Sequence, residues 1–237
     1  MGVLFDNLTL AEAVDAGERL AAGPGFAYVV TPNPEIVNLA RQREDYRQVL
    51  NGAGLVLPDG IGVIHAAKIL GTPLQERVPG IDFASGLLTR LAQTGGRLFL
   101  LGAKPGVADQ AADNLRKTYP GLTVCGTHHG YFQEDGLVVE AIRQAQADVV
   151  FVCLGAPSQE VWMAQHGPAT GAHLMVGLGG RAGCVRRPCE AGPGCLAEAG
   201  AGVVLPPAPP AQPHRPDGQA PWLPGGGRRG EAKAGKP

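Results

Sequence analysis

The chain has 237 residues, of which 44% are hydrophobic, and its formal net charge is −1 at pH 7. A chain of this length can bury one sizeable core, so we expect one domain with at most an appendage. The small net charge argues against nucleic acid as a partner held by bulk electrostatics. The N-terminus lacks the features of a signal peptide, and no apolar stretch approaches a membrane-spanning length. We therefore expect the protein to start and stay in the cytoplasm.

Six apolar runs of strand length recur along the chain, and most are followed by a segment with helical spacing. The runs lie at 25–31, 54–57, 97–102, 122–126, 148–155 and 173–179. Helical spacing is present at 34–50, 61–70, 81–95, 105–119, 135–146 and 158–167. The prolines at positions 34 and 105 are placed to be first helical residues. The alternation indicates an α/β fold with a Rossmann-like, mostly parallel sheet and helices on both faces.

Polar or glycine-rich turns follow four of the predicted strands. They read TPNPE (31–35), PDGIG (58–62), GAKPG (102–106) and GAPSQE (155–160). Ligands of such sheets bind beyond the carboxyl ends of the strands, so we expect these turns to converge along one edge. Asp59 would then belong to a site.

Each turn also has a purely structural interpretation. Asn33 and Asp59 are good helix-capping residues, and GAKPG resembles many strand-to-helix loops that bind nothing. Arg77 could lie on an ordinary surface turn. However, residues that serve only as helix caps would not be expected at the end of one strand after another. The four polar turns taken together therefore favour a binding site.

Together, residues 31–41, 55–83, 98–112, 129–132 and 151–166 resemble the WecG/TagA/CpsF family of bacterial glycosyltransferases. The resemblance runs from about residue 1 to Gly180. It implies an inverting transfer of N-acetylmannosamine, or a related sugar, from a UDP donor to N-acetylglucosamine on undecaprenyl diphosphate. The reaction would serve teichoic acid or surface polysaccharide synthesis at the inner face of the cell membrane. It would need no metal and no cofactor, and the resemblance leaves an oligomer open.

The resemblance also implies roles for individual residues. Asp59 would be the general base for the acceptor hydroxyl, which suits a carboxylate whose pKa is raised by partial burial. The other residues that it places at the substrates are Thr31, Asn33, Arg77, Gly80, Asp82, Gly102, Lys104, Pro105, Gly106, Tyr131, Gln159 and Glu160. Residues Gly102 to Val107 would cradle the uridine diphosphate, and Gln159 and Glu160 would hold the sugar donor. Ser158 stands where the family has a lysine.

Two other classes of function remain open. A nicotinamide-dependent oxidoreductase needs a glycine fingerprint and a ribose-binding acid, and we find neither. A non-catalytic nucleotide-binding protein would use Asp59 only as a cap.

The composition changes at Arg181. Residues 181–237 hold 11 Gly and 11 Pro and no Ile, Phe, Tyr or Met. Such a segment indicates a disordered tail. A zinc site at Cys184, Cys189 and Cys195 has poor spacing, and a proline-rich ligand segment is a further alternative.

We interpret this tail as the product of a shifted reading frame. Codon degeneracy allows residues 182–193 to be reread as LD(V/A)FAGRVKRAP, which resembles the start of a basic appendage that docks the family on membranes. The chain as given should then fold through about residue 180 and have weak activity or none.

Overall fold

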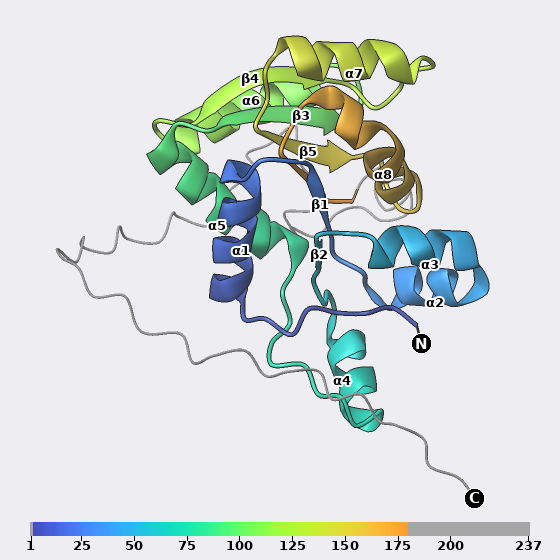
Figure 1. The fold of residues 1–237 in the computed structure, drawn as a ribbon. Helices are drawn as coiled ribbons and strands as arrows, with labels where there is room; N and C mark the ends of the chain where they lie inside the picture. The colour runs from blue at the N-terminus through green and yellow to red at the C-terminus, as the bar shows by residue number, and fades with distance from the viewer. Residues whose placement is uncertain (1, 180–237) are drawn as a thin grey trace, which may run out of the picture.

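The structure is a computed structural model that describes residues 2–179. In this part of the chain, eight helices alternate with the six strands of one sheet (Figure 1). The tail predicted for residues 181–237, with its zinc-site, proline-rich and reading-frame interpretations, lies outside the described residues.

Every neighbouring pair of strands in the sheet is parallel, and the strand order is β2-β1-β6-β5-β3-β4. The strands are β1 (Ala27–Val30), β2 (Leu55–Val56), β3 (Arg97–Gly102), β4 (Thr123–His128), β5 (Val149–Cys153) and β6 (Leu174–Gly177). Each lies within or overlaps one of the predicted apolar runs. The α/β fold class and the six strands are therefore confirmed.

Helices cover both faces of the sheet, as predicted. One face carries α1 (Leu10–Ala22), α5 (Gly80–Thr94) and α6 (Val107–Thr118). The other carries α2 (Pro34–Gln42), α3 (Glu44–Asn51), α7 (Asp135–Gln144) and α8 (Ser158–Thr170). The remaining helix, α4 (Ile61–Ile69), projects from the body beyond β2 (Figure 1).

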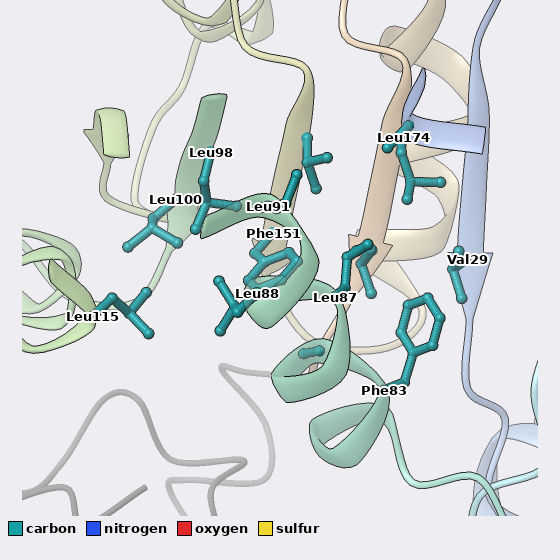
Figure 2. Packing of buried hydrophobic residues seen from close by; sticks show 14 of the residues in the cluster. Val29, Phe83, Leu87, Leu88, Leu91, Leu98, Leu100, Leu115, Phe151 and Leu174 are labelled. Carbon is teal, nitrogen blue, oxygen red and sulfur yellow. The ribbon is translucent and has the colours of Figure 1, made fainter. Parts of the chain in front are cut away.

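The two faces have separate apolar cores because side chains alternate along each strand. In β5, Val149 and Phe151 pack on the α5 face, whereas Val150 and Val152 pack on the α8 face. Figure 2 shows Phe83 and Leu87 of α5 turned toward the strands; both are fully buried. All four of these β5 residues are buried, which explains why the strand reads as a continuous apolar run.

Three helices differ from the predictions. The helix expected at 34–50 is broken at Arg43, whose extended backbone (φ −127°, ψ 104°) ends α2 and starts α3. This break turns α3 so that Tyr46 and Leu50 are both fully buried. The helix α1 was not predicted from the sequence; its signal is the capping box of Thr9 and Glu12.

The third difference is the start of α6. Pro34 is the first residue of α2, as predicted, but α6 begins at Val107 rather than at Pro105. The preceding residue, Gly106, has a left-handed backbone (φ 82°), which a helix cannot continue through. Residues 102–106 therefore form a loop of their own.

No helix in residues 2–179 combines the length and the apolar character needed to cross a membrane.

Candidate active site

The four polar turns lie along one edge of the sheet, because every strand points the same way. Their order along the edge is PDGIG after β2, TPNPE after β1, GAPSQE after β5 and GAKPG after β3, with β6 between β1 and β5. The predicted convergence is confirmed. The ends of β2 and β3 are four strand spacings apart, about 19 Å. The edge thus has an Asp59 end and a GAKPG end.

Asp59 is held between the sheet and the start of α5. Its N–H donates to the Pro32 carbonyl oxygen (3.3 Å), and the backbone N–H groups of Gly80 and Gly60 are close enough to favour its ionised carboxylate. Gly80 is the first residue of α5, so the carboxylate faces the positive end of a helix dipole. The N-cap of α4 is Gly60, with no side-chain cap. The interpretation of Asp59 as the cap of α4 is therefore wrong.

The pKa of Asp59 is raised above its ordinary value of 3.8. Burial is the largest cause, and the nearby charge of Asp82 acts in the same direction. The N–H groups of Gly80 and Gly60 and the charge of Arg77 oppose the shift without cancelling it. Partial burial was expected to raise the pKa of this carboxyl group in this way. A carboxylate with a raised pKa is a stronger base once ionised.

Other predicted residues gather around this carboxylate. A Cβ added at Gly80 would lie 3.0 Å from Thr31 Oγ1, so the threonine side chain packs directly on the start of α5. The Val78 N–H donates to the Pro58 carbonyl oxygen (2.9 Å), which holds the segment carrying Arg77 beside the PDG turn. The structure thus brings together Thr31, Asp59, Arg77, Gly80 and Asp82.

Asn33 caps α2, as the structural interpretation of its turn predicted. Its Oδ1 accepts a hydrogen bond from the Ile36 N–H (2.9 Å). The side chain stays half-buried next to the Asp59 end of the edge. Its amide nitrogen is the part that can meet a ligand.

Gln159 and Glu160 are buried in the middle of the edge, 3% and 2% exposed. Gln159 Oε1 accepts hydrogen bonds from the N–H groups of Gly155 (3.3 Å) and Gly179 (3.1 Å), which ties the end of β5 to the end of β6. Gln159 Nε2 donates to Glu160 Oε1 (2.8 Å), and Tyr46 donates to Glu160 Oε2 (3.0 Å). In this arrangement the side chains of Gln159 and Glu160 hold the middle of the edge together, and their binding of the sugar donor stays a prediction.

Burial raises the pKa of Glu160, although the hydrogen bonds from Gln159 and Tyr46 oppose the shift. Tyr46 was not predicted as a site residue. No local pattern signals it, because it lies 114 residues from its partner in the sequence.

The GAKPG loop forms the other end of the edge. Gly102 has φ 134°, and a Cβ there would lie 2.4 Å from the Cys153 carbonyl oxygen, so only glycine fits. Ala103 also has a positive φ (62°), an unusual conformation for a residue with a side chain. Gly130 donates from its N–H to the Ala103 carbonyl oxygen (2.8 Å), which brings the half-exposed Tyr131 to this loop.

The remaining loop residues, Lys104, Pro105 and Gly106, are exposed. The loop therefore offers backbone and side-chain groups to solvent at the start of α6, where anions bind well. Within residues 2–179, His, Cys, Asp and Glu side chains form no group of three or more able to hold a metal ion.

A profile of the family described as glycosyl transferase WecG/TagA/CpsF matches residues 1–185. The chain belongs to this family.

Two curated relatives of this WecG/TagA/CpsF chain carry one name, N-acetylglucosaminyldiphosphoundecaprenol N-acetyl-beta-D-mannosaminyltransferase. The protein from Bacillus spizizenii is 37% identical over 154 residues, which cover 65% of this chain and 60% of the relative. The protein from Staphylococcus aureus strain NCTC 8325 is 36% identical over 183 residues, covering 76% of this chain and 72% of the relative. The chain therefore spans only part of the length of either relative.

Ser158, where the resemblance implied a lysine, is the first residue of α8, and its side chain is exposed. A lysine at this position would lie beside the buried Gln159 and Glu160 at the surface of the same edge. Ser158 supplies no positive charge there.

Proposed function

We propose that this chain transfers N-acetylmannosamine, or a related sugar, from a UDP donor to N-acetylglucosamine on undecaprenyl diphosphate. The position of Asp59 carries the proposal: a half-buried carboxylate with a raised pKa, beside Arg77 at the sheet edge where ligands of this fold class bind. The names of the two relatives support the choice of sugar and acceptor. Membership of the family supports the reaction class.

The reaction requires one proton acceptor. Asp59 removes the proton from the acceptor hydroxyl as its oxygen attacks the anomeric carbon of the donor sugar. The bond from that carbon to the UDP oxygen breaks on the opposite face, so UDP leaves with both electrons and the configuration inverts. The N–H groups of Gly80 and Gly60 favour the ionised carboxylate, which is the form that accepts the proton.

The leaving diphosphate develops negative charge, which cations and N–H groups must stabilise. Arg77 supplies a positive charge at the Asp59 end. The GAKPG loop supplies backbone donors at the start of α6 for the phosphates of the nucleotide. Such groups suffice for charge stabilisation without a metal ion, and we therefore expect turnover in the presence of EDTA to equal turnover without it.

The lipid acceptor resides in a bilayer, so the proposal places the enzyme at the cytoplasmic face of the membrane. The reading-frame interpretation of residues 181–237 belongs to the same proposal. Resequencing codons 175–190 in the source organism tests it, because one inserted or deleted base should restore FAGRVKRAP. An unchanged sequence would contradict the interpretation.

The function is tested by Asp59→Asn, assayed in a version of the chain with the restored reading frame. We expect kcat to fall by about 10²–10⁴-fold, because the amide cannot accept the proton. The affinity for UDP, measured by calorimetry, should stay unchanged. Asp113→Asn, at an exposed acid on α6, is the matched control. UDP binding with undiminished turnover in Asp59→Asn would contradict the role of Asp59 and favour a non-catalytic nucleotide-binding protein.

A further inference from the structure

An apolar groove of about 250 Å³ lies between α2 and α4. The N-terminal segment of the chain forms its third wall. Residues that shape it include Phe5, Val37, Arg41, Ala66, Ala67 and Leu70. Figure 1 shows α4 projecting from the sheet on the side where α2 and the N-terminus lie.

Hydrogen bonds fix the third wall in place. Asn51, at the end of α3, accepts from the Leu4 N–H (3.0 Å) and donates to the Gly2 carbonyl oxygen (2.8 Å). Asp6 is bound through both its backbone and its carboxylate to Val56 of β2 (2.9 and 2.8 Å). The groove is therefore formed before any ligand arrives.

One end of the groove adjoins Asp59. Pro34, at the start of α2, lies so close to α4 that a Cβ at Gly62 would be 2.9 Å from its ring, and a Cβ at Gly60 would be 3.2 Å from it. Pro34 directly follows Asn33, and Gly60 directly follows Asp59. The groove thus begins next to the Asp59 end, and a ligand that extends from a sugar at Asp59 into the groove passes over the contact between Pro34 and α4.

The surface around the groove is apolar and basic. Ile61, Ile69 and Leu70 are 61%, 85% and 58% exposed, which is unusual for three large aliphatic side chains on one short segment. The helix α4 contains Lys68 and no acidic residue, and Arg41 lines the groove itself. This combination suits a ligand with an apolar chain and an anionic group.

We infer that this groove binds the first isoprene units of the acceptor lipid, which rests on the function proposed above. In that acceptor the isoprenoid lipid follows the diphosphate directly. The lipid must therefore leave the Asp59 end across the protein surface. A dry cavity of about 150 Å³ can hold a six-carbon ring, so the groove has room for about ten carbon atoms, or two isoprene units. The rest of the lipid leaves past the exposed Ile69 and Leu70 toward the bilayer.

Binding of soluble acceptor analogues to the full chain tests the inference without any turnover. The probes are N-acetylglucosamine diphosphate esters carrying a methyl, a five-carbon, a ten-carbon or a fifteen-carbon prenyl group, and Kd is measured by calorimetry. We expect Kd to fall at least tenfold from the methyl to the ten-carbon ester, then to change less than threefold. A Kd that does not depend on chain length overturns the inference.

Ala67→Trp, which fills the groove, should abolish this dependence while leaving the Kd of the methyl ester and of UDP unchanged. Ala67→Leu fills it partly and should give an intermediate dependence, which guards against a variant that does not fold. Ala22→Trp, at the exposed end of α1, is the matched control and should behave as the parent chain. A dependence that survives Ala67→Trp places the lipid elsewhere and overturns the inference.

Other occupants give distinct outcomes. If phospholipid vesicles compete with the ten-carbon ester equally well in Ala67→Trp and in the parent chain, the inference is overturned. It is also overturned if Ala67→Trp abolishes self-association of the chain without affecting ester binding. The proposed function fails separately. If a version with the restored reading frame shows the expected length dependence but no sugar transfer, the groove assignment stands and the proposed function fails. Equal transfer to the methyl and prenyl esters by that version would do the reverse.

Discussion

Tyr46 on α3 donates a hydrogen bond of 3.0 Å to Glu160 on α8, and both side chains are buried. Glu160 in turn accepts from Gln159, which holds the ends of β5 and β6 together through two backbone N–H groups. A buried polar chain therefore fixes the middle of the edge on which the substrates are proposed to bind. Such a chain is stabilising only while every member keeps its partner.

Gln159→Leu should lower the free energy of unfolding by about 1–3 kcal/mol, because the buried Gly155 N–H loses its acceptor. Urea denaturation measures the loss. Gln110→Leu, on the exposed side of α6, is the control and should change stability by less than about 0.5 kcal/mol. Equal effects of the two substitutions would show that the tie between the strands contributes nothing.

Glu160→Gln should make stability less dependent on pH. Burial raises the pKa of Glu160, so the unfolded chain ionises near the ordinary value of 4.5 while the folded chain still holds the proton. The free energy of unfolding therefore falls as pH rises from 4.5 to the raised pKa, and this contribution stays low above it. Between pH 4.5 and the raised pKa, the unfolding free energy of the parent should fall with pH more steeply than that of Glu160→Gln. Parallel curves in a pH series of urea titrations would refute the shift.

Gly102→Ala should weaken both stability and UDP binding more than Gly106→Ala does. Both glycines have positive φ, which costs an alanine about 1–2 kcal/mol. At Gly102 the new methyl group also meets the Cys153 carbonyl oxygen, whereas nothing lies within 4 Å at Gly106. The clash adds about 1–3 kcal/mol. Denaturation and calorimetry with UDP measure the two effects, and similar losses in both variants would mean that the loop moves to accept the methyl group.

The pH profile of kcat/KM should report the pKa of Asp59. Only the ionised carboxylate accepts a proton, so activity falls as pH drops through a pKa that lies above 3.8. Arg77→Gln removes a charge that favours ionisation and should move this acid limb to higher pH. Asp82→Asn removes a charge that opposes ionisation and should move it to lower pH. Acid limbs that superimpose on that of the parent would exclude Asp59 as the titrating group.

The strands were predictable because all except β4 are largely buried on both faces and so read as apolar runs. Their shared direction followed from the helices between them, and this placed the Asp59, GAKPG and GAPSQE turns on one edge. The arrangement of the side chains at this edge was harder to predict from the sequence. Gln159 and Glu160 were expected to hold the donor, yet each is occupied by partners that the sequence does not reveal, and Tyr46 carries no motif of its own.

The missed boundaries have local physical causes. A helical pattern continues through Arg43, but burial of Tyr46 and Leu50 requires a change of direction there. Pro105 has the usual place of a first helical residue, but the left-handed Gly106 delays α6. In both cases a tertiary requirement or a single backbone conformation overrides a periodic pattern.

The position of β6 in the sheet has a consequence for biosynthesis. This strand alone connects β1 to β5, and it is the last strand of the described chain. While the ribosome is still adding residues before Leu174, the nascent polypeptide holds two partial sheets whose open edges face each other without a bridge. Unpaired edges of this kind are prone to pair with other chains. Both edges therefore stay open until β6 pairs, and the Asp59 end and the GAKPG end reach their final spacing in that one step.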